Sequence, residues 1–337
     1  MHALTIRQAA GAADVATAAR LFREYAEGLG ISLCFQGFDS EVATLPGTYA
    51  PPSGRLLLAE DERGPAGCIA LRDLSGGRCE MKRLYVRPEA RGGGAGKQLV
   101  RRLLAEAAAC GYARMLLDSL PGVMDAALAL YLRLGFTDIA PYYDNPNPGV
   151  RYLQLPLPRV TFRPLAADDM PLLHRWLNQP HMRAHYQPRE VSLAEVSAKY
   201  GPRLAPDSVC ACHVALVDGR PAGKLQCYRN VDHRAYADAI GATDGVSVDL
   251  FLGDPALTGR GVGAAMLRRY VGEVVFARWP GERRCTIAHA ESNPRAIACS
   301  RAAGFRPVRA VLDDGVPSQL FELDRADLIP TPEDLHP

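Results

Sequence analysis

A strand–glycine loop–helix pattern occurs twice in the 337-residue chain and constrains its fold more than any other feature. Each copy has a short apolar strand, a loop with a proline, glycines spaced Gly-x-Gly-x-Gly, and a helix with apolar residues at i, i+3 and i+4. The last loop glycines, Gly96 and Gly263, lie 167 residues apart, and the glycines that end a later helix, Gly135 and Gly304, lie 169 apart. Two landmarks with nearly equal offsets predict a tandem duplication.

The break between the two halves is predicted at the proline-punctuated segment 156–159, directly before a new strand at 160–163. We therefore expect two domains of ordinary size, residues 1–157 and 158–337. Hydrophobic residues make up 48% of the chain, which is enough for a packed core in each domain. This composition excludes a disordered or fibrous chain.

Charge and hydropathy exclude several classes of function. The net charge of +2, from 39 basic and 37 acidic residues, is too balanced for a protein that binds nucleic acid electrostatically. No apolar run reaches the ~18 residues of a transmembrane helix, so no membrane partner is expected. Residues 1–7 lack the pattern of a secretory leader, and the expected compartment is the cytosol.

The nine cysteines are scattered singly, and none of them forms a CxxC pair. Cys210, Cys212 and His213 come closest to the spacing of metal ligands. Alternation along a strand would put only two of them on one face, where zinc needs three or four ligands. We therefore expect reduced cysteines used as small apolar residues, and no metal site.

A glycine loop between a strand and a helix presents unpaired backbone N–H groups beside the positive end of the helix dipole, which favours a phosphate or pyrophosphate. A P-loop is excluded, because Arg91 and Gln98 stand where that motif needs glycine and Ser or Thr. Gly259, Gly261 and Ala264 fit a dinucleotide fingerprint only formally. The first of these glycines lies too far from its strand, and arginines stand near the position of the expected acid.

Residues 91–96 match the pattern Arg/Gln-x-x-Gly-x-Gly/Ala. With the helix, strand and Gly-Phe pair at matched spacing, both halves resemble the GNAT superfamily of acetyl-CoA-dependent N-acyltransferases, and the resemblance covers essentially the whole chain. It implies a mixed α/β fold with two GNAT domains in tandem. Each would be a twisted, mostly antiparallel sheet flanked by helices, with a parallel splayed strand pair gripping coenzyme A. Acetyl-CoA is the implied cofactor: the loop would hold its pyrophosphate, and the preceding strand would pair with its pantetheine arm.

The residues that the resemblance assigns to coenzyme A lie in the two glycine loops, at the ends of the preceding strands and at the start of the last helix. In the first half they are Leu84, Val86, Arg91, Gly92, Gly93, Gly94, Ala95, Gly96 and Lys97, and in the second half Phe251, Leu252, Gly259, Arg260, Gly261, Val262, Gly263, Ala264 and Asn293. The second half departs from the pattern at its first loop position, where Thr258 replaces Arg or Gln.

Acetyl transfer to an amine needs a neutral amine, a polarised thioester carbonyl and a proton for the leaving thiolate. By the resemblance, Tyr131, four residues before Gly135, is the general acid for the sulfur; the alternative is a half-buried tyrosine bonded to a carbonyl. Glu80, at the start of a strand, could act as the base, directly or through water, or could be a solvated strand carboxylate. The N-terminal helix and the loop 34–38 are expected to wall the acceptor pocket of this half.

The second half has Ser300 where the first half has Tyr131. A serine is a poor proton donor to a thiolate, so this half either uses another acid or has lost activity. Segments 176–181, 248–253 and 293–297 resemble the aminoglycoside 6′-N-acetyltransferases. In those enzymes an aspartate ten residues before the first loop glycine contacts the amine, and Asp249 has this spacing from Gly259. The alternative for Asp249 is a strand-end carboxylate in solvent.

A pocket for a polycationic aminoglycoside should be acidic. Asp232, Asp238 and Asp244 make the segment before Asp249 only mildly acidic. The sequence therefore predicts an acetyl-CoA-dependent N-acetyltransferase that modifies a primary amine of a small molecule, with an aminoglycoside as one candidate for the second half. Two alternatives stay open: a siderophore-type hydroxylamine acyltransferase, or one catalytic half beside a second half that only binds coenzyme A or substrate. The oligomeric state is not predicted.

Overall fold

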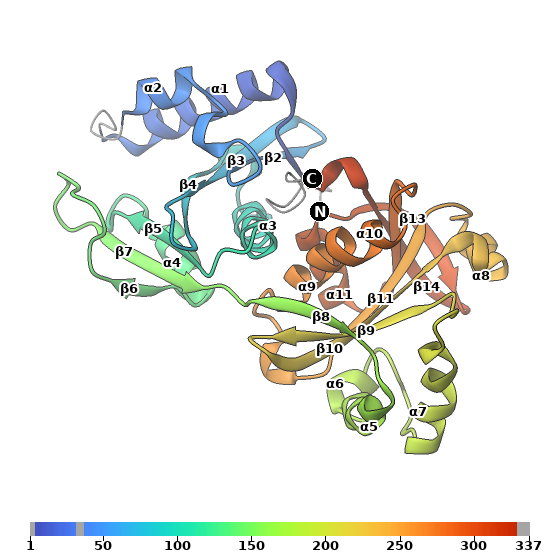
Figure 1. Ribbon diagram of the computed structural model, residues 1–337. Helices are drawn as coiled ribbons and strands as arrows, with labels where there is room; N and C mark the ends of the chain where they lie inside the picture. Colours follow the sequence, from blue (N-terminus) through green and yellow to red (C-terminus); the bar gives the residue numbers. More distant parts are fainter. Residues whose placement is uncertain (1–3, 32–36, 329–337) are drawn as a thin grey trace. The chain divides into compact units, whose positions relative to one another are not determined.

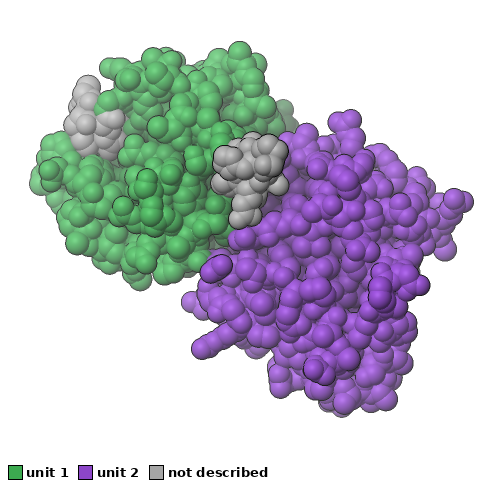
Figure 2. Space-filling view, viewed as in Figure 1, with its two compact units in different colours: residues 1–157, 329–337 green, residues 158–328 purple. Residues whose placement is uncertain are grey.

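The structure is a computed structural model that describes residues 4–31 and 37–328. These residues form two compact units, unit 1 within 4–157 and unit 2 within 158–328 (Figure 2). The division of the chain into domains 1–157 and 158–337 stays a prediction. Residues 34–36 of the loop expected at the acceptor pocket lie outside the described residues.

Unit 1 begins with a strand and a long helix, and after a short helix three strands follow before the next α-helix (Figure 1). Its elements are β1 (Thr5–Gln8), α1 (Gly11–Leu29), α2 (Phe38–Ala43), β2 (Arg55–Asp61), β3 (Gly64–Asp73), β4 (Arg78–Val86), α3 (Ala95–Ala109), β5 (Arg114–Ser119), α4 (Asp125–Arg133), β6 (Thr137–Ile139) and β7 (Arg151–Pro156).

Unit 2 repeats this order with additional short helices between its first two strands, between its third and fourth strands and after α9 (Figure 1). Its elements are β8 (Val160–Pro164), α5 (Met170–Leu177), α6 (Pro180–Arg183), α7 (Leu193–Tyr200), β9 (Ala211–Val217), β10 (Arg220–Arg229), α8 (Arg234–Ile240), β11 (Val246–Leu252), α9 (Val262–Tyr270), α10 (Phe276–Arg278), β12 (Arg284–Ala290), α11 (Pro294–Ala303), β13 (Arg306–Asp313) and β14 (Val316–Asp324). A π-helical turn, Val271–Val275, joins α9 to α10.

Each unit is built on one seven-stranded sheet, and the two sheets have the same topology. The order is β1-β2-β3-β4-β5-β7-β6 in unit 1 and, read in the same direction, β8-β9-β10-β11-β12-β14-β13 in unit 2. All neighbours are antiparallel except β4 with β5 and β11 with β12. This confirms the predicted fold of two mixed α/β domains in tandem, each with one parallel strand pair.

The parallel strands separate soon after they begin to pair. β4 pairs with β5 only from Arg78 to Glu80, although β4 continues to Val86. β11 pairs with β12 only at Val246 and Ser247, although β11 continues to Leu252. Beyond these points one edge of β4 and of β11 is left without a neighbouring strand among the described residues, which is the splayed pair that the resemblance implied.

Helices cover both faces of each sheet, and the two faces are distinct environments. In unit 1, α3 and α4 pack on one face over Leu57, Ile69 and Met115, whereas α1 packs on the other face over Leu56 and Leu58. The strand period of two residues assigns each side chain of a strand to one of these faces. None of the described helices has the length and apolar composition needed to cross a membrane.

The glycine loops have the same backbone conformation in both units. Gly92 and Gly94 have φ of 86° and 81°, and Gly259 and Gly261 have φ of 80° and 81°. A residue with a side chain would be strained by about 1–2 kcal/mol in this left-handed region. The repeated Gly-x-Gly spacing is therefore required by the turn that leads from strand to helix.

Candidate active site

The helix after each glycine loop begins with a row of unpaired backbone N–H groups. The N-terminus of α3 has no side-chain cap, and the first N–H that bonds behind it is that of Gln98, which donates to the Gly94 carbonyl at 3.1 Å. In unit 2 the corresponding bond runs from Ala265 to Gly261. Within the described residues, the N–H groups of 92–97 and 259–264 have no backbone partner. Each loop can therefore hold a phosphate or pyrophosphate.

The third glycine of the loop in unit 2 serves close packing. A Cβ on Gly263 would lie 3.1 Å from Cys299 Sγ on α11, whereas a Cβ on Gly96 would make only an ordinary contact, 3.8 Å from Val86. In unit 2 the start of α9 can therefore lie close against α11. Lys97 and Arg260 are exposed at the loops, where their charge would attract an anion.

Two predicted ligands of coenzyme A have other partners in the structure. Arg91 Nε donates to the carbonyl of Val86 at 2.9 Å, so its guanidinium is folded back on the end of β4. Asn293 Oδ1 accepts the N–H of Ala296 at 3.1 Å and caps the N-terminus of α11. Either side chain would have to leave its partner to contact a bound cofactor.

The predicted strand residues turn their side chains inward. Leu84 and Val86 pack against the core under α3 and α4, and the Phe251 ring lies 6.2 Å from that of Trp176. The Leu252 carbonyl accepts a hydrogen bond from His181 Nε2 at 2.9 Å. The open edge of β4 is therefore lined by backbone N–H and C=O groups, which suits a ligand that forms hydrogen bonds with amide groups.

Tyr131 lies near the end of α4 and belongs to the hydrophobic core under that helix. Its side chain is mostly buried, in contact with Phe136, and its hydroxyl makes no hydrogen bond to the described residues. Burial, and then Tyr25 and Asp118, raise the pKa of Tyr131 well above its usual value. A protonated, unpaired hydroxyl at this point can donate a proton.

Glu80 is fully buried, which overturns the alternative of a solvated carboxylate. Its carboxylate accepts Arg72 Nε at 2.6 Å and the Tyr142 hydroxyl at 2.7 Å, and it lies 3.6 Å from Lys82 Nζ. These partners occupy both carboxylate oxygens. A role for Glu80 as a base is therefore restricted to an indirect one through Lys82.

An ion pair that sequence reasoning missed bridges the strands of unit 1 where they separate. Lys82 Nζ lies 3.2 Å from Asp118 Oδ1, two residues beyond the last paired residues, Glu80 and Leu116. Lys82 thus lies between two carboxylates, those of Glu80 and Asp118. The Asp118 side chain is 15% exposed, whereas Glu80 is 0% exposed, so a ligand can reach Asp118 but not Glu80. Only the register of β4 with β5 reveals that the two side chains meet.

In unit 2 the position equivalent to Tyr131 is occupied by a buried hydrogen-bonded pair. Ser300 is 0% exposed, and its Oγ lies 2.7 Å from Nε2 of His289 on β12. Burial lowers the pKa of His289 to about 4, so the ring is neutral at pH 7. Sequence reasoning missed His289, whose only signal was its place near the end of a strand.

Asp249 lies at the centre of the β10–β11 pair and is partly exposed. Directly opposite it, Gln226 donates through Nε2 to Asp249 Oδ2 at 2.7 Å. The amide oxygen of Gln226 in turn accepts Arg203 Nη1 at 2.5 Å and Lys224 Nζ. The carboxylate is thus held through one amide by two cations, a network that the spacing of single residues did not predict.

The three aspartates of the segment before Asp249, which was expected to be only mildly acidic, differ in their contacts. Asp232 pairs with Arg229 at 2.9 Å, and Asp244 pairs with Arg284. Asp238 is exposed on α8. Neighbouring arginines thus offset the charges of Asp232 and Asp244, and the expectation that this segment is only mildly acidic stays a prediction.

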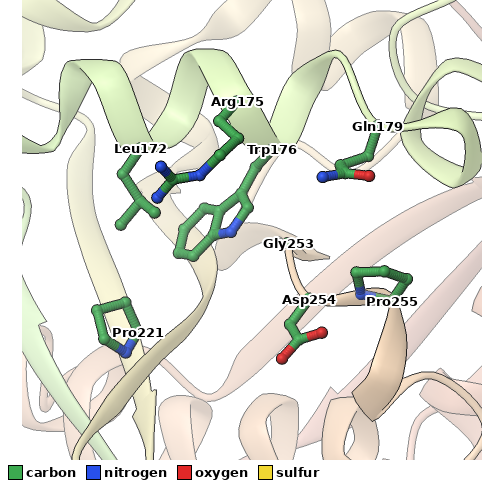
Figure 3. Close-up of a pocket in the computed structure, with 8 residues that line it drawn as sticks. All are labelled: Leu172, Arg175, Trp176, Gln179, Pro221, Gly253, Asp254 and Pro255. Carbon is green, nitrogen blue, oxygen red and sulfur yellow. The ribbon is translucent and has the colours of Figure 1, made fainter.

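A cavity of about 320 Å³ lies between α5 and the turn after β11 (Figure 3). The Trp176 indole fills the space over Gly253, where a Cβ would come within 2.1 Å of the ring. None of the predicted site residues lines this cavity; its lining is Leu172, Arg175, Trp176, Gln179, Pro221, Gly253, Asp254 and Pro255. Segment 176–181 thus positions the end of β11, through Trp176 and through His181.

Two family models match the chain, and both carry the description "Acetyltransferase (GNAT) domain". One matches residues 52–138, which lie in unit 1, and the other matches residues 166–312, which lie in unit 2. Residues 52–138 include the first glycine loop with Glu80 and Tyr131, and residues 166–312 include the second loop with Asp249 and Ser300.

Several known proteins are similar to parts of the chain. It is 44% identical over 137 residues to an uncharacterized N-acetyltransferase of Schizosaccharomyces pombe, a match that spans 40% of this chain and 83% of that protein. It is 28% identical over 158 residues to the aminoglycoside N(6′)-acetyltransferase type 1 of Klebsiella pneumoniae, spanning 43% and 73%. A solved structure of AAC(6′)-Ib in complex with acetyl-CoA is 26% identical, covers 50% of this chain and 94% of that one, and has a TM-score of 0.43.

Proposed function

Because the chain belongs to the GNAT family of acetyltransferases, we propose that each unit binds acetyl-CoA at its glycine loop and that at least one unit acetylates a primary amine of a small molecule. The observation that carries this proposal is the row of unpaired N–H groups at 92–97 and 259–264, which begins a helix just after a strand with an open edge. A pyrophosphate would be held by these N–H groups, with Lys97 or Arg260 nearby.

Acetyl-CoA, when bound, supplies an acetyl thioester that the amine attacks. The chain must then take one proton from the amine and deliver one to the sulfur, as a new C–N bond replaces the C–S bond. Binding both reactants also places them in contact, which removes most of the entropic cost of their encounter.

For unit 2 we propose Asp249 as the group that binds the amine and takes its proton. Its carboxylate is partly exposed, and Gln226 fixes its orientation by occupying only one of its oxygens in the described residues. The other oxygen can face a ligand. The aminoglycoside N(6′)-acetyltransferase relative is the reason to include aminoglycosides among the candidate amines.

For unit 1 we propose Tyr131 as the proton donor to the sulfur and Asp118 as the carboxylate that receives the amine. The Tyr131 hydroxyl is unpaired in the described residues and lies near Asp118, which is reachable where β4 and β5 separate. Glu80, which is buried, would orient Lys82 and Arg72 through its ion pairs with them. We also propose that the protein works in the cytosol, because the eight described cysteines are all free thiols.

A second candidate function is a division of labour between the units. Ser300 is buried and bonded to His289, so unit 2 lacks the free tyrosine hydroxyl of unit 1. This favours one catalytic unit and one that only binds acetyl-CoA or the acceptor. A hydroxylamine acceptor is a further alternative, because a hydroxylamine needs less help from a base than an ammonium group does.

The test is release of free coenzyme A thiol from acetyl-CoA with a panel of small amines, kanamycin and a hydroxylamine, for the wild type and for Asp249→Asn and Tyr131→Phe. Loss of a general base or acid should slow the unit concerned by about 100-fold or more. If only Tyr131→Phe loses turnover, unit 2 is the accessory half. No turnover with any acceptor, although acetyl-CoA binds, would contradict amine acetylation.

A further inference from the structure

Three cations of unit 2 surround the ring of Tyr200 beside Asp249. The side-chain charges of Lys199, Arg203 and Lys224 lie 5.6, 5.4 and 4.8 Å from the ring centroid. Lys199 and Tyr200 end α7, Arg203 belongs to the following turn, and Lys224 lies on β10. Lys224 is only 1% exposed, so its charge is removed from water. Burying an ammonium group is costly unless an anion or strong hydrogen bonds compensate it.

The cations of this cluster share few side-chain acceptors among the described residues. Arg203 and Lys224 both donate to one acceptor, the amide oxygen of Gln226. Among the described residues, none of the three cations forms an ion pair with a carboxylate. A guanidinium has five N–H donors and an ammonium has three. The Tyr200 hydroxyl is also buried without a hydrogen-bond partner in the described part of the chain.

The anionic groups that face the cluster do not balance its charge. Asp249 is reached only through Gln226, whose amide nitrogen it accepts. The pKa of the Cys212 thiol is lowered to about 6, mainly by a hydrogen bond from Cys210 and further by the positive charges of Lys224 and Arg203. With Cys212 ionised, Asp249 and Cys212 match the charges of Arg203 and Lys224, and Lys199, which is exposed, adds a third positive charge at the surface of the cluster. The net positive charge is thus within reach of an anion that the protein itself does not provide.

Coenzyme A is a poor candidate for this anion. Its pyrophosphate is proposed at residues 259–263, and its arm at the open edge of β11 that faces β12. Lys224 and Gln226 lie on β10, which pairs with the opposite edge of β11. The cationic cluster therefore lies on the acceptor side of Asp249.

We propose that the acceptor of unit 2 is an amine that carries a carboxylate, bound with its amine at Asp249 and its carboxylate at Arg203 and Lys199. The planar fork of an arginine matches a carboxylate in two parallel hydrogen bonds. One Gln226 side chain links Asp249 to Arg203, so the carboxylate oxygen and the guanidinium nitrogen that it joins are separated by no more than about 8 Å, from the lengths of two hydrogen bonds and an amide. This inference rests on the proposed function of unit 2 and names its substrate class.

The first test compares ω-amino carboxylates from β-alanine to 6-aminohexanoate with n-alkylamines of matched length and with kanamycin, by release of coenzyme A thiol. Only the turnover that is lost in Asp249→Asn is assigned to unit 2. For this turnover, each ω-amino carboxylate should have a kcat/KM at least about 10-fold higher than the alkylamine of the same length. Arg203→Gln should reduce kcat/KM for the carboxylates by about 10- to 100-fold more than for the alkylamines, the usual effect of losing a charge-assisted hydrogen bond; both acceptors share any disturbance of Gln226 and Asp249. Arg220→Gln, at the exposed start of β10, is the matched control and should change neither.

A second measurement separates this inference from the proposed function. Binding of 5-acetamidopentanoate and of N-pentylacetamide, which differ in the carboxylate and cannot be acetylated at an amine, is followed by calorimetry and ligand-observed NMR. The inference predicts that only the carboxylate binds and that Arg203→Gln and Lys199→Gln each weaken it, whether or not any amine is acetylated. Equal binding of both compounds, or binding that ignores Arg203→Gln, would overturn it even if amine acetylation is established.

Discussion

One residue distinguishes the chemistry of the two units. Tyr131 and Ser300 both stand four residues before the glycine that ends the helix, at Gly135 and Gly304. Around Tyr131 the hydroxyl is left without a partner in the described residues, close to Asp118. Around Ser300 the space that a tyrosine ring would need is closed, because the side chain is 0% exposed and His289 bonds its oxygen at 2.7 Å.

Restoring a tyrosine at this position should therefore fail to restore a proton donor. Ser300→Tyr is expected to lower the free energy of unfolding of unit 2 by about 1–3 kcal/mol through overpacking, with no gain in acetyl transfer. Ser300→Ala, the small control, should cost only about 1 kcal/mol from the lost hydrogen bond. The free energy of unfolding of both variants is measured by urea unfolding. The signal is the fluorescence of Trp176 and Trp279, the two tryptophans of the chain, which lie in unit 2. An unchanged stability with faster turnover would show that the position is open.

At the residue scale the sequence predicted positions better than partners. The repeat placed Tyr131, Ser300 and the glycines correctly, because their spacing along the chain is local information. The contacts of Asp118 and Gln226 depend on which residues face each other across strands, and one-residue shifts in register reverse the face of every side chain. In β4 a bulge adds to this: Arg83 has φ of 57°, and the pairing with β3 shifts there.

At the scale of elements, α5 is fixed to the end of β11 by close contact. The Trp176 indole lies so close to Gly253 that a Cβ there would come within 2.1 Å of the ring, and His181 donates to the Leu252 carbonyl at 2.9 Å. This contact sets where β11 ends and therefore where the loop to Gly259 begins. Packing of the element, more than contact with a ligand, explains the sequence of segment 176–181.

Gly253→Ala tests this packing. The added methyl has to displace the indole or the strand, so the free energy of unfolding of unit 2 should fall by about 1–3 kcal/mol. Gly272→Ala is the control, since Gly272 lies in a helical turn with no atom near its Cβ position and alanine favours helix. Urea unfolding followed by tryptophan fluorescence compares the two variants. A Gly253→Ala variant as stable as the wild type would contradict the account of how α5 is held.

At the scale of the molecule, the two units share a topology but differ in their response to acid. Residues 4–157 contain no histidine, whereas unit 2 has His213 and His289, whose pKa values burial lowers to about 4. In the unfolded chain these rings take up protons near pH 6.5. The folded unit 2 resists protonation until about pH 4, so its stability is present above pH 6.5 and is lost as the pH falls toward 4.

Unit 2 should therefore be destabilised selectively between pH 7 and pH 5. His289 alone lowers its free energy of unfolding by up to about 3 kcal/mol by the time its own pKa is reached. The pKa values of Asp14 and Glu41 in unit 1 are lowered by Arg7 and Arg83, and those groups lose their contributions only below their usual range near pH 4. Tryptophan fluorescence should show a falling urea midpoint from pH 7 to pH 5, and His289→Gln should flatten this trend. A midpoint independent of pH would contradict the assignment of buried neutral histidines.

The central claim is that both glycine loops bind acetyl-CoA, and a calorimetric titration of the full-length protein tests it most directly. The wild type should bind two acetyl-CoA per chain. Gly94→Val and Gly261→Val force a β-branched residue into a φ near 81° and should each remove one site. Gly111→Val is the matched control, because Gly111 has the same φ at the other end of α3. Two sites in the wild type and one in each loop variant are predicted; no binding, or a number of sites that neither loop variant changes, would contradict the account.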